Sequence, residues 1–361
     1  MKKLILLAAT AFALFSCENG KDDELSEPKT KNVVVQFAPT VLTRATEGAV
    51  TSGAKATISN YTIFFLDAAG NVVKGTKSGT SSPVDAVACT DVGETAVSVY
   101  VVANASGVAG LDLSGITVGS STLVDIKKKV AEVSTQATIT SVVLANSAKT
   151  DNGKIEVTNS AGTVTYAAAV EVAPVICRLE IGKIEGTGDI TGFKLEGIYI
   201  DGHAVKFNIG GGYDKTVNDA STHTKDGIYS IGVDNSLLTG YPNNFCDVAQ
   251  ISATGSSDTW TAAPSSSKVW AYQLAADAPM PKIIVKLSGV NGVTGDKYVT
   301  VNSYKANGSV YTKLLPSTVY KIEKISFEVK NTAEVPNATE KEVSVTVSIK
   351  GWDVVNLTPE V

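Results

Sequence analysis

The sequence predicts a mostly β protein with two domains, on the basis of its composition and its length. Val, Thr, Ser and Gly are abundant whereas Leu, Met and Glu are few, and this balance favours short strands and turns over helices. The 361 residues suffice for two ordinary domains, because a single core stops growing well below this size. The net charge is −5 and no basic patch occurs, so nucleic acid is not an expected partner.

The first 17 residues predict an export signal that is not part of the fold. Two lysines precede an apolar run from Leu4 to Phe15, and the sequence Leu14 to Cys17 resembles a bacterial lipobox. By that resemblance, cleavage leaves Cys17 as the first residue, and its lipid anchors the precursor in the outer membrane. An ordinary secretory signal with an incidental cysteine is the alternative. No later run of the sequence is long and apolar enough to span a bilayer.

A charged tether and a first strand come next. Residues 18–32 are polar and charged, which is typical of a flexible tether. Period-two alternation then predicts a strand from Val33 to Leu42. Its apolar positions are Val33, Val35, Phe37, Val41 and Leu42. Behind it, the Arg44-Ala45 bond lies among small residues and glycine, where a trypsin-like protease finds an accessible site.

A hairpin and a buried strand follow the tether region. The run from Ile58 to Leu66 is typical of a strand, and Asp67 to Asn71 has the residues of a tight turn. Val72 and Val73 begin the returning strand, which completes a hairpin. The apolar run from Ala96 to Val102 predicts another buried strand.

One helix is predicted between Ser121 and Val133. Its apolar residues recur at helical spacing, and the three lysines at 127–129 lie mostly on the opposite face. Thr122 and Asp125 have the spacing of a capping box at the helix start. We expect this helix to cover one side of a sheet.

The second half of the chain predicts further strands. Residues 138–172 predict three or four short strands, and Pro174 interrupts the next apolar run, which indicates a domain boundary there. Residues 210–265 are rich in Gly, Ser, Asp and Asn and predict long surface loops. The remaining strands are expected at Val175–Ile181, Gly192–Ile200, Val205–Ile209, Lys268–Leu274, Lys282–Leu287, Tyr298–Tyr304 and Val319–Val329.

The end of the chain carries two amphipathic stretches. Alternation from Val343 to Ile349 predicts a strand, and Gly351, Trp352 and Asp353 interrupt it. A second alternation then runs to the last residue, with its apolar positions at Val355, Leu357, Pro359 and Val361. Chain ends are usually frayed and polar, whereas this one has an apolar face, so we expect it to be buried against a partner.

Catalytic and metal-binding patterns are missing from the sequence. Its two histidines, His203 and His223, lie in no nucleophile motif, and Gly210 to Gly212 precede no helix that could cradle a phosphate. The loop acids lack the spacing of a calcium loop; they are Asp201, Asp214, Asp219 and Asp226. We therefore expect no enzyme activity, no cofactor and no metal.

Cysteines and aromatic residues also receive structural interpretations. With Cys17 assigned to the lipid, Cys89, Cys177 and Cys246 are left, and their odd number without CxxC spacing favours buried inert thiols, one disulfide being the alternative. Scattered aromatic residues favour core positions, and a carbohydrate platform is the alternative interpretation. The residues concerned are Trp260, Trp270, Tyr241 and Tyr272.

In their order along the chain, these motifs resemble the fimbrillins, or type V pilins, of Bacteroidetes. The lipobox and tether come first, and the chain closes with a Trp between two strands. Along the rest of the chain, the resemblance is carried by six segments, which are Leu42–Ala45, Phe64–Gly70, Val101–Ala105, Ile176–Ile181, Pro316–Ile322 and Lys350–Trp352. The resemblance covers essentially the whole chain, and the order of the motifs carries it rather than any single one.

The resemblance implies two β-sandwich domains of transthyretin-like, Greek-key type with one or two short helices, and a fimbrial subunit at the cell surface. It implies a signal at 1–17, a tether and propeptide strand at 18–44, an N-terminal domain at 45–174 and a C-terminal domain at 175–361. An Arg-specific surface protease would cut between Arg44 and Ala45 and displace the strand from Val33 to Leu42. The donor strand 354–361 of another copy, or of a related subunit, would fill the groove, with Trp352 at the junction.

Three other functions are weighed against this one. A tip or accessory adhesin of the same family is the first. A surface glycan-binding lipoprotein that never polymerises is the second, and it would keep its first strand and bind sugar at Trp260 or Trp270. An exported hydrolase is the third, and the lack of a catalytic set opposes it.

Overall fold

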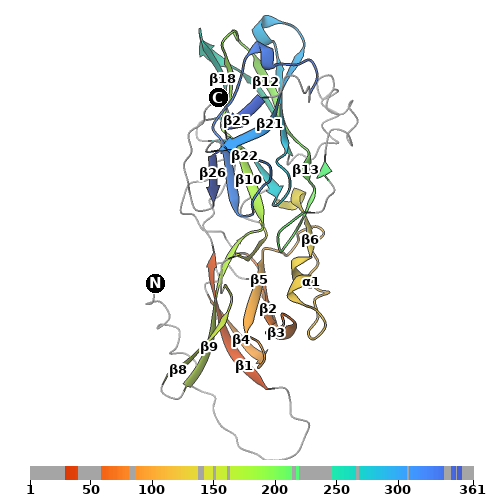
Figure 1. Cartoon of the computed structure of the whole chain (residues 1–361), viewed down its shortest axis with the longest axis vertical. Coiled ribbons are helices and arrows are strands. Elements are labelled where there is room, and N and C mark those ends of the chain that lie inside the picture. The colour runs from red at the N-terminus through yellow and green to blue at the C-terminus, as the bar shows by residue number, and fades with distance from the viewer. Residues whose placement is uncertain are drawn as a thin grey trace, which may run out of the picture.

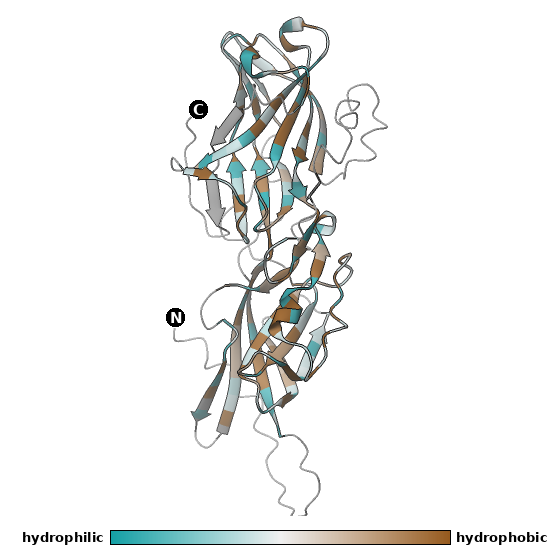
Figure 2. Cartoon of the chain, turned by 45° about the vertical axis from the view of Figure 1, so that its right-hand side comes forward, coloured by the Kyte–Doolittle hydropathy of each residue, from teal (hydrophilic) through white to brown (hydrophobic). Residues whose placement is uncertain are grey.

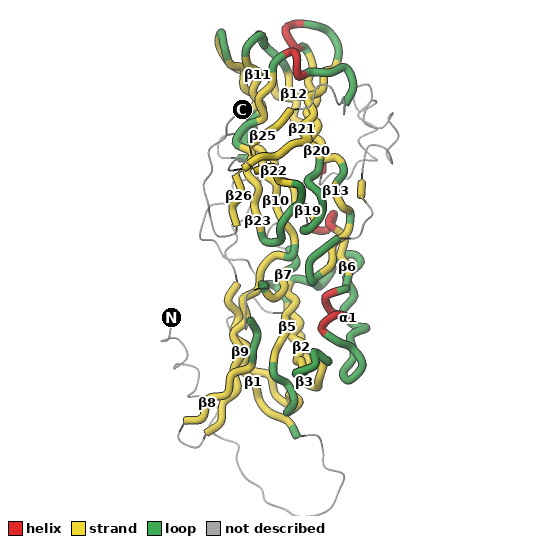
Figure 3. Tube along the Cα trace, in the orientation of Figure 1, coloured by secondary structure: helices red, strands yellow, loops and turns green. Residues whose placement is uncertain are grey.

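The computed structural model of the chain describes residues 29–39, 58–80, 86–136, 142–148, 152–160, 163–213, 217–218, 245–265, 268–306, 309–336, 343–346 and 348–351. The described residues form two parts stacked along the long axis of the molecule, and we call residues 29–174 the N-terminal part and those from 175 on the C-terminal part (Figure 1). Strands dominate both parts, so the mostly β prediction is confirmed (Figure 3). No helix within the described ranges is long and apolar enough to cross a membrane.

The described strands of the N-terminal part form one curled sheet and a short linker strand. They are β1 (Thr30–Pro39), β2 (Tyr61–Leu66), β3 (Val72–Gly79), β4 (Ala86–Gly93), β5 (Ser98–Ala103), β6 (Val130–Glu132), β7 (Leu144–Asn146), β8 (Ile155–Ser160) and β9 (Thr163–Pro174). The sheet order is β3-β2-β5-β7-β9-β1-β4, and β8 pairs with β9. The predicted hairpin, β2 with β3, and the predicted strand β5 are therefore confirmed.

The two ends of this sheet meet. Gly75 of β3 has a φ of +117°, and a Cβ placed on it would lie 2.9 Å from the Cα of Val92 in β4. Only glycine tolerates both that backbone conformation and that contact. Lys74 and Asp91 add an exposed ion pair of 2.8 Å across the same edges. The sheet therefore wraps around its own apolar core.

The described strands of the C-terminal part form two layers. They are β10 (Ile176–Ile181), β11 (Ile184–Thr187), β12 (Lys194–Asp201), β13 (His203–Ala204), β14 (Lys206–Asn208), β15 (Val217–Asn218), β16 (Cys246–Ser252), β17 (Thr254–Ser256), β18 (Thr259–Ala262), β19 (Trp270–Ala275), β20 (Lys282–Ser288), β21 (Asp296–Ala306), β22 (Ser309–Tyr311), β23 (Thr318–Ile322), β24 (Ile325–Phe327), β25 (Val343–Thr346) and β26 (Ser348–Gly351).

One layer joins two short sheets end to end. The sheet β19-β10-β23-β26 continues into β17-β18-β11-β24. Main-chain bonds cross the break, because Gly182 N donates to Ile322 O at 2.9 Å and Ile325 N to Lys183 O at 2.9 Å. The second layer is β16-β12-β20-β21-β22, with β25 also on β21. Apolar side chains of both layers share one core, as in a sandwich. The ribbon coloured by hydropathy shows hydrophobic residues along strands of this part (Figure 2).

A small antiparallel ladder joins the two parts. β6 of the N-terminal part pairs with β14 of the C-terminal part, and Ala131 lies opposite Phe207. Both side chains are fully buried. Val133 N also donates to Val205 O at 2.9 Å. Beside this ladder lies a cleft of about 750 Å³ between the parts, lined by residues such as Tyr100 and Ser317.

Several sequence predictions are corrected by these pairings. The helix α1 spans only Leu123–Lys127, although its capping box between Thr122 and Asp125 is present. The chain leaves the helix because residues 130–132 pair with β14. The predicted loop region 210–265 contains β16, β17 and β18, and the predicted strand Val319–Val329 breaks into β23 and β24.

Candidate functional site

The first strand occupies an interior position of the N-terminal sheet. β1 runs parallel to β9, with Val33 opposite Tyr166 and Phe37 opposite Val170. On its other side β1 runs antiparallel to β4, with Val33 opposite Cys89. We call the space between β9 and β4 that β1 fills the β1 slot. Two walls of main-chain donors and acceptors bound this slot, so an extended segment is what fits it.

Apolar side chains fill the inner face of the slot. Val33, Val35 and Phe37 are 1%, 0% and 7% exposed. Their burial stabilises the fold by roughly 1.5 to 3 kcal/mol each relative to exposed side chains. The ring of Phe37 lies 5.5 Å from that of Tyr61, centroid to centroid, and burial raises the pKa of the Tyr61 hydroxyl. The alternation seen in the sequence therefore corresponds to a buried face.

The start of β1 is polar. Lys31 Nζ donates to Ala96 O at 2.6 Å and to Glu94 O at 3.0 Å. The same ammonium group lies 4.7 Å from the ring centroid of Tyr166. Burial lowers the pKa of Lys31, and the nearby carboxylate of Glu94 opposes this shift. The sequence predicts that this lysine belongs to the tether, because no sequence pattern indicates two carbonyl partners more than 60 residues away.

Cys89 lies beside β1, on the neighbouring strand β4. It is the Cα partner of Val33, and it is 1% exposed. Burial raises the pKa of its thiol to about 11, so it is inert while β1 is in place. Cys177 is also buried, whereas Cys246 is only partly buried, which corrects the prediction of three buried thiols.

The described end of the chain is attached to the C-terminal part. β25 pairs in parallel with β21, and β26 pairs antiparallel with β23, so that Gly351 lies opposite Thr318. The stretch expected to form one strand, Val343 to Ile349, is thus two strands in different layers. β25 therefore lies beside β21 in one layer and β26 beside β23 in the other.

Many predicted site residues lie outside the described residues, and their roles stay predictions. The group consists of Cys17, Val41, Leu42, Arg44, Ala45, Trp352, Val355, Leu357, Pro359 and Val361. His223, Tyr241, Asp214, Asp219 and Asp226 are also outside. The structure therefore describes the buried face of the predicted displaced strand and the main chain that leads to the predicted donor.

The other polar candidates have structural partners. His203 is buried, donates a 2.9 Å hydrogen bond from Nδ1 to Ile200 O, and stacks on Phe245. Trp270 is buried at 6% exposure, whereas Trp260 is half-buried. Within the described part of the chain, no three His, Cys, Asp or Glu side chains gather as metal ligands would.

Solved structures share this arrangement of strands, whereas no protein-family model and no curated protein matches the chain. A fimbrilin from Porphyromonas gingivalis W83 superposes with a TM-score of 0.52 at 14% identity, over 90% of this chain and 98% of its own. The fold is that of a fimbrilin. A candidate cell adhesion protein from Parabacteroides distasonis ATCC 8503 gives 0.50 at 13% identity, over 91% and 96%. The resemblance to Bacteroidetes fimbrial proteins is thereby confirmed at the level of the fold.

Proposed function

We propose that this protein is a structural subunit of cell-surface fimbriae that assembles when β1 is exchanged for a strand of a neighbouring copy. The observation that carries the proposal is the interior position of β1, the first described strand, between β9 and β4. Removal of an interior strand opens two edges at once, and open edges pair readily with another strand. The shared fimbrilin fold supports the same conclusion.

In this proposal the precursor is lipidated at Cys17 and reaches the outer membrane, where an Arg-specific protease cuts between Arg44 and Ala45. The cut separates β1 from an N-terminal domain at 45–174. The strand 354–361 of a C-terminal domain at 175–361 then enters the slot of the next copy, using Val355, Leu357, Pro359 and Val361. Main-chain pairing supplies affinity, and the apolar positions supply register.

The donor strand needs help from the strand before it. Its four apolar side chains contribute roughly 1.5 to 3 kcal/mol each on burial. Ordering about eight residues costs on the order of 1 to 2 kcal/mol apiece, so the two nearly cancel. β26 already holds the chain in the sheet up to Gly351. We therefore expect β26 and Trp352 to present the donor partly ordered, and a Trp352→Ala variant to form weaker filaments.

The proposed subunit has no catalytic role. The glycan-binding alternative loses one of its two platforms, because Trp270 is buried and cannot stack on a sugar. A tip or accessory adhesin of the same family is the other alternative, and no feature of the described residues favours it over a subunit within the filament.

Cleavage of the purified precursor tests the proposal. A trypsin-like protease is added, the new N-terminus is sequenced, and the oligomers are measured by native mass spectrometry. We expect a new N-terminus at Ala45 together with growing oligomers, and neither in an Arg44→Gln variant. Cleavage at Ala45 that leaves only monomers would contradict strand exchange.

A further inference from the structure

Lys31 donates hydrogen bonds to two carbonyl groups in the residues that follow β4. Its ammonium group donates to Ala96 O at 2.6 Å and to Glu94 O at 3.0 Å. The main chain adds a bond at the same place, because Glu94 N donates to Lys29 O at 3.0 Å. Between Lys31 and Val33 the register on β4 slips, so the strand is irregular where the side chain takes hold. The start of β1 is therefore fastened to the β4 wall by a charged donor.

The same side chain touches the opposite wall. Tyr166 belongs to β9, and its ring centroid lies 4.7 Å from Lys31 Nζ. An ammonium group at this distance from an aromatic ring is attracted to it. Lys31 thus bridges both walls of the β1 slot, whereas Val33, Val35 and Phe37 only fill it.

We propose that Lys31 is a positioning residue that latches β1 in its slot and sets how often the slot opens. The purpose of the latch rests on the proposed function. Once the chain is cut behind Arg44, no covalent bond holds β1 to the rest of the protein. The latch then keeps the cut strand in place until another strand displaces it, which prevents an empty slot from pairing at random.

The proposed donor cannot remake the latch. Residues 352–361 contain no lysine or arginine. Apolar positions recur in both strands, so the donor can replace the contacts of Val33, Val35 and Phe37, but not the bonds of the Lys31 ammonium group. The latch therefore distinguishes the strand that guards the slot from the strand that replaces it.

Two buried cysteines report the opening of the slot. Cys89 lies beside Val33 and is 1% exposed, so we expect departure of β1 to uncover its thiol. Cys177 in β10 of the C-terminal part is fully buried and reports unfolding elsewhere. The ratio of their alkylation rates separates the opening of the slot from general destabilisation.

The test is iodoacetamide labelling of the uncut full-length protein, followed residue by residue by mass spectrometry. In the Lys31→Met variant we expect Cys89 to be labelled about tenfold faster, because a hydrogen bond from a charged group is lost. The labelling rate of Cys177 should not change. Lys31→Arg should restore a rate near that of the natural protein. Lys29→Met, at an exposed lysine on the same segment, is the matched control and should change neither rate.

Equal Cys89 rates in Lys31→Met and the natural protein would overturn the latch, as would a parallel rise at Cys177. If Lys31→Met does not fold, Tyr166→Leu removes only the aromatic wall and is expected to raise the Cys89 rate several-fold; an unchanged rate would again overturn it. No protease or assembly enters this experiment. Failure of the cleavage test would therefore sink the proposed function and leave the latch result standing.

Discussion

The two parts of the molecule each hold a strand in parallel on another, yet they fasten it differently. β1 lies parallel to β9 and is held by apolar side chains and by Lys31, which contacts the Tyr166 ring of β9 and the carbonyl oxygens behind β4. In the C-terminal part, β23 and β24 lie on β10 and β11. Ion pairs join β23 to β10 and β24 to β11. Another alternating strand can remake the apolar contacts of Val33, Val35 and Phe37, which suits a strand that leaves, whereas specific ion pairs suit a strand that stays.

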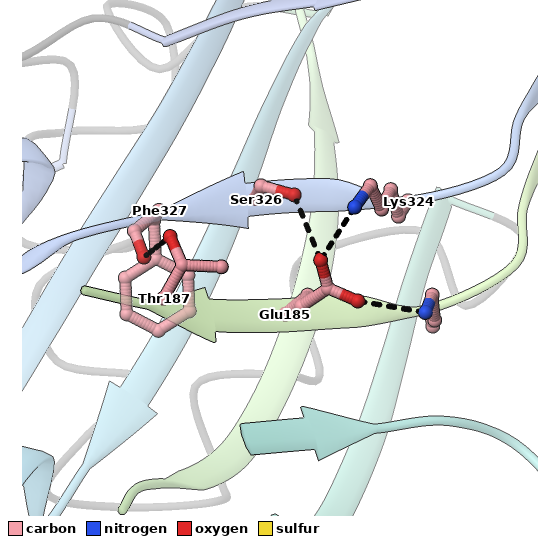
Figure 4. A network of polar contacts seen from close by, with 6 residues as sticks. Glu185, Thr187, Lys324, Ser326 and Phe327 are labelled. Carbon is pink, nitrogen blue, oxygen red and sulfur yellow. Dashed lines mark hydrogen bonds and ion pairs between the residues drawn. The ribbon is translucent and has the colours of Figure 1, made fainter. Parts of the chain in front are cut away.

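Two groups of ion pairs in the C-terminal part centre on the buried carboxylates of Glu185 and Glu180. Lys324 and Lys183 lie 2.6 and 2.7 Å from the two carboxylate oxygens of Glu185, and Ser326 donates to one of these oxygens (Figure 4). Glu180 is paired with Arg178 at 2.8 Å, and both side chains are at most 3% exposed. Replacing Glu180 therefore takes a carboxylate away from the buried charge of Arg178, whereas replacing Glu185 affects two partly exposed lysines.

The largest effect is expected from a charge in the β1 slot. Val35→Asp places a carboxylate at a fully buried position and should cost on the order of 5 kcal/mol of the free energy of unfolding. Fast Cys89 labelling with slow Cys177 labelling would locate the damage in the N-terminal part. Val34→Asp, on the half-buried opposite face, is the control and should cost far less. A Val35→Asp variant that still protects Cys89 would break the comparison.

A smaller effect is expected in the other part. Glu180→Ala removes the carboxylate that pairs with buried Arg178 and with Lys321, and breaking a buried pair typically costs about 3 to 5 kcal/mol. Urea unfolding should show the loss, and Cys177 should label faster while Cys89 does not. Lys74→Ala removes an exposed pair of 51% and 58% exposure and should cost under about 0.5 kcal/mol. Equal losses from the two variants would show that burial of the pair is unimportant.

The smallest effect is expected from Glu185, through the dependence of stability on acidic pH. Burial would raise the pKa of Glu185, but hydrogen bonds and charge from Lys183 and Lys324 outweigh it, so the pKa is lowered. The stabilisation is therefore complete above the ordinary Glu pKa of about 4.3 and is lost as pH falls through the lower folded value. Glu185→Gln should lose about 1 kcal/mol at pH 7 and show a shallower decline below about pH 4.3 in urea titrations. An identical pH dependence in the two proteins would remove Glu185 from the account.

The sequence predicts where strands lie better than it predicts which strands pair with one another. Alternation at Val33, Val35 and Phe37 predicts a strand with one buried face, and the structure has it. The same alternation is silent on β9 as a parallel neighbour, because pairing depends on residues more than 100 positions away. A partner distant in sequence also shortened the helix, since residues 130–132 pair with β14 rather than extend α1.

Side-chain roles at the site were predicted unevenly. The apolar residues of β1 follow from periodicity, because burial of one face leaves a pattern in the sequence. Lys31 leaves none, since a lysine at the start of a strand normally points to water and its partners here are main-chain oxygens. The sequence predicts a buried Cys89, but its place beside Val33 depends on the register between β1 and β4.

The exchange of β1 for a donor strand is tested most directly by truncation. The precursor and a variant that ends at Gly351 are both cut behind Arg44, and mass spectrometry counts the β1 fragment bound to each species. The account predicts that the full chain releases one fragment for each contact formed in an oligomer, while the truncated chain stays monomeric with its fragment bound and Cys89 protected. Equal assembly by the truncated chain, or oligomers that retain β1, would contradict it.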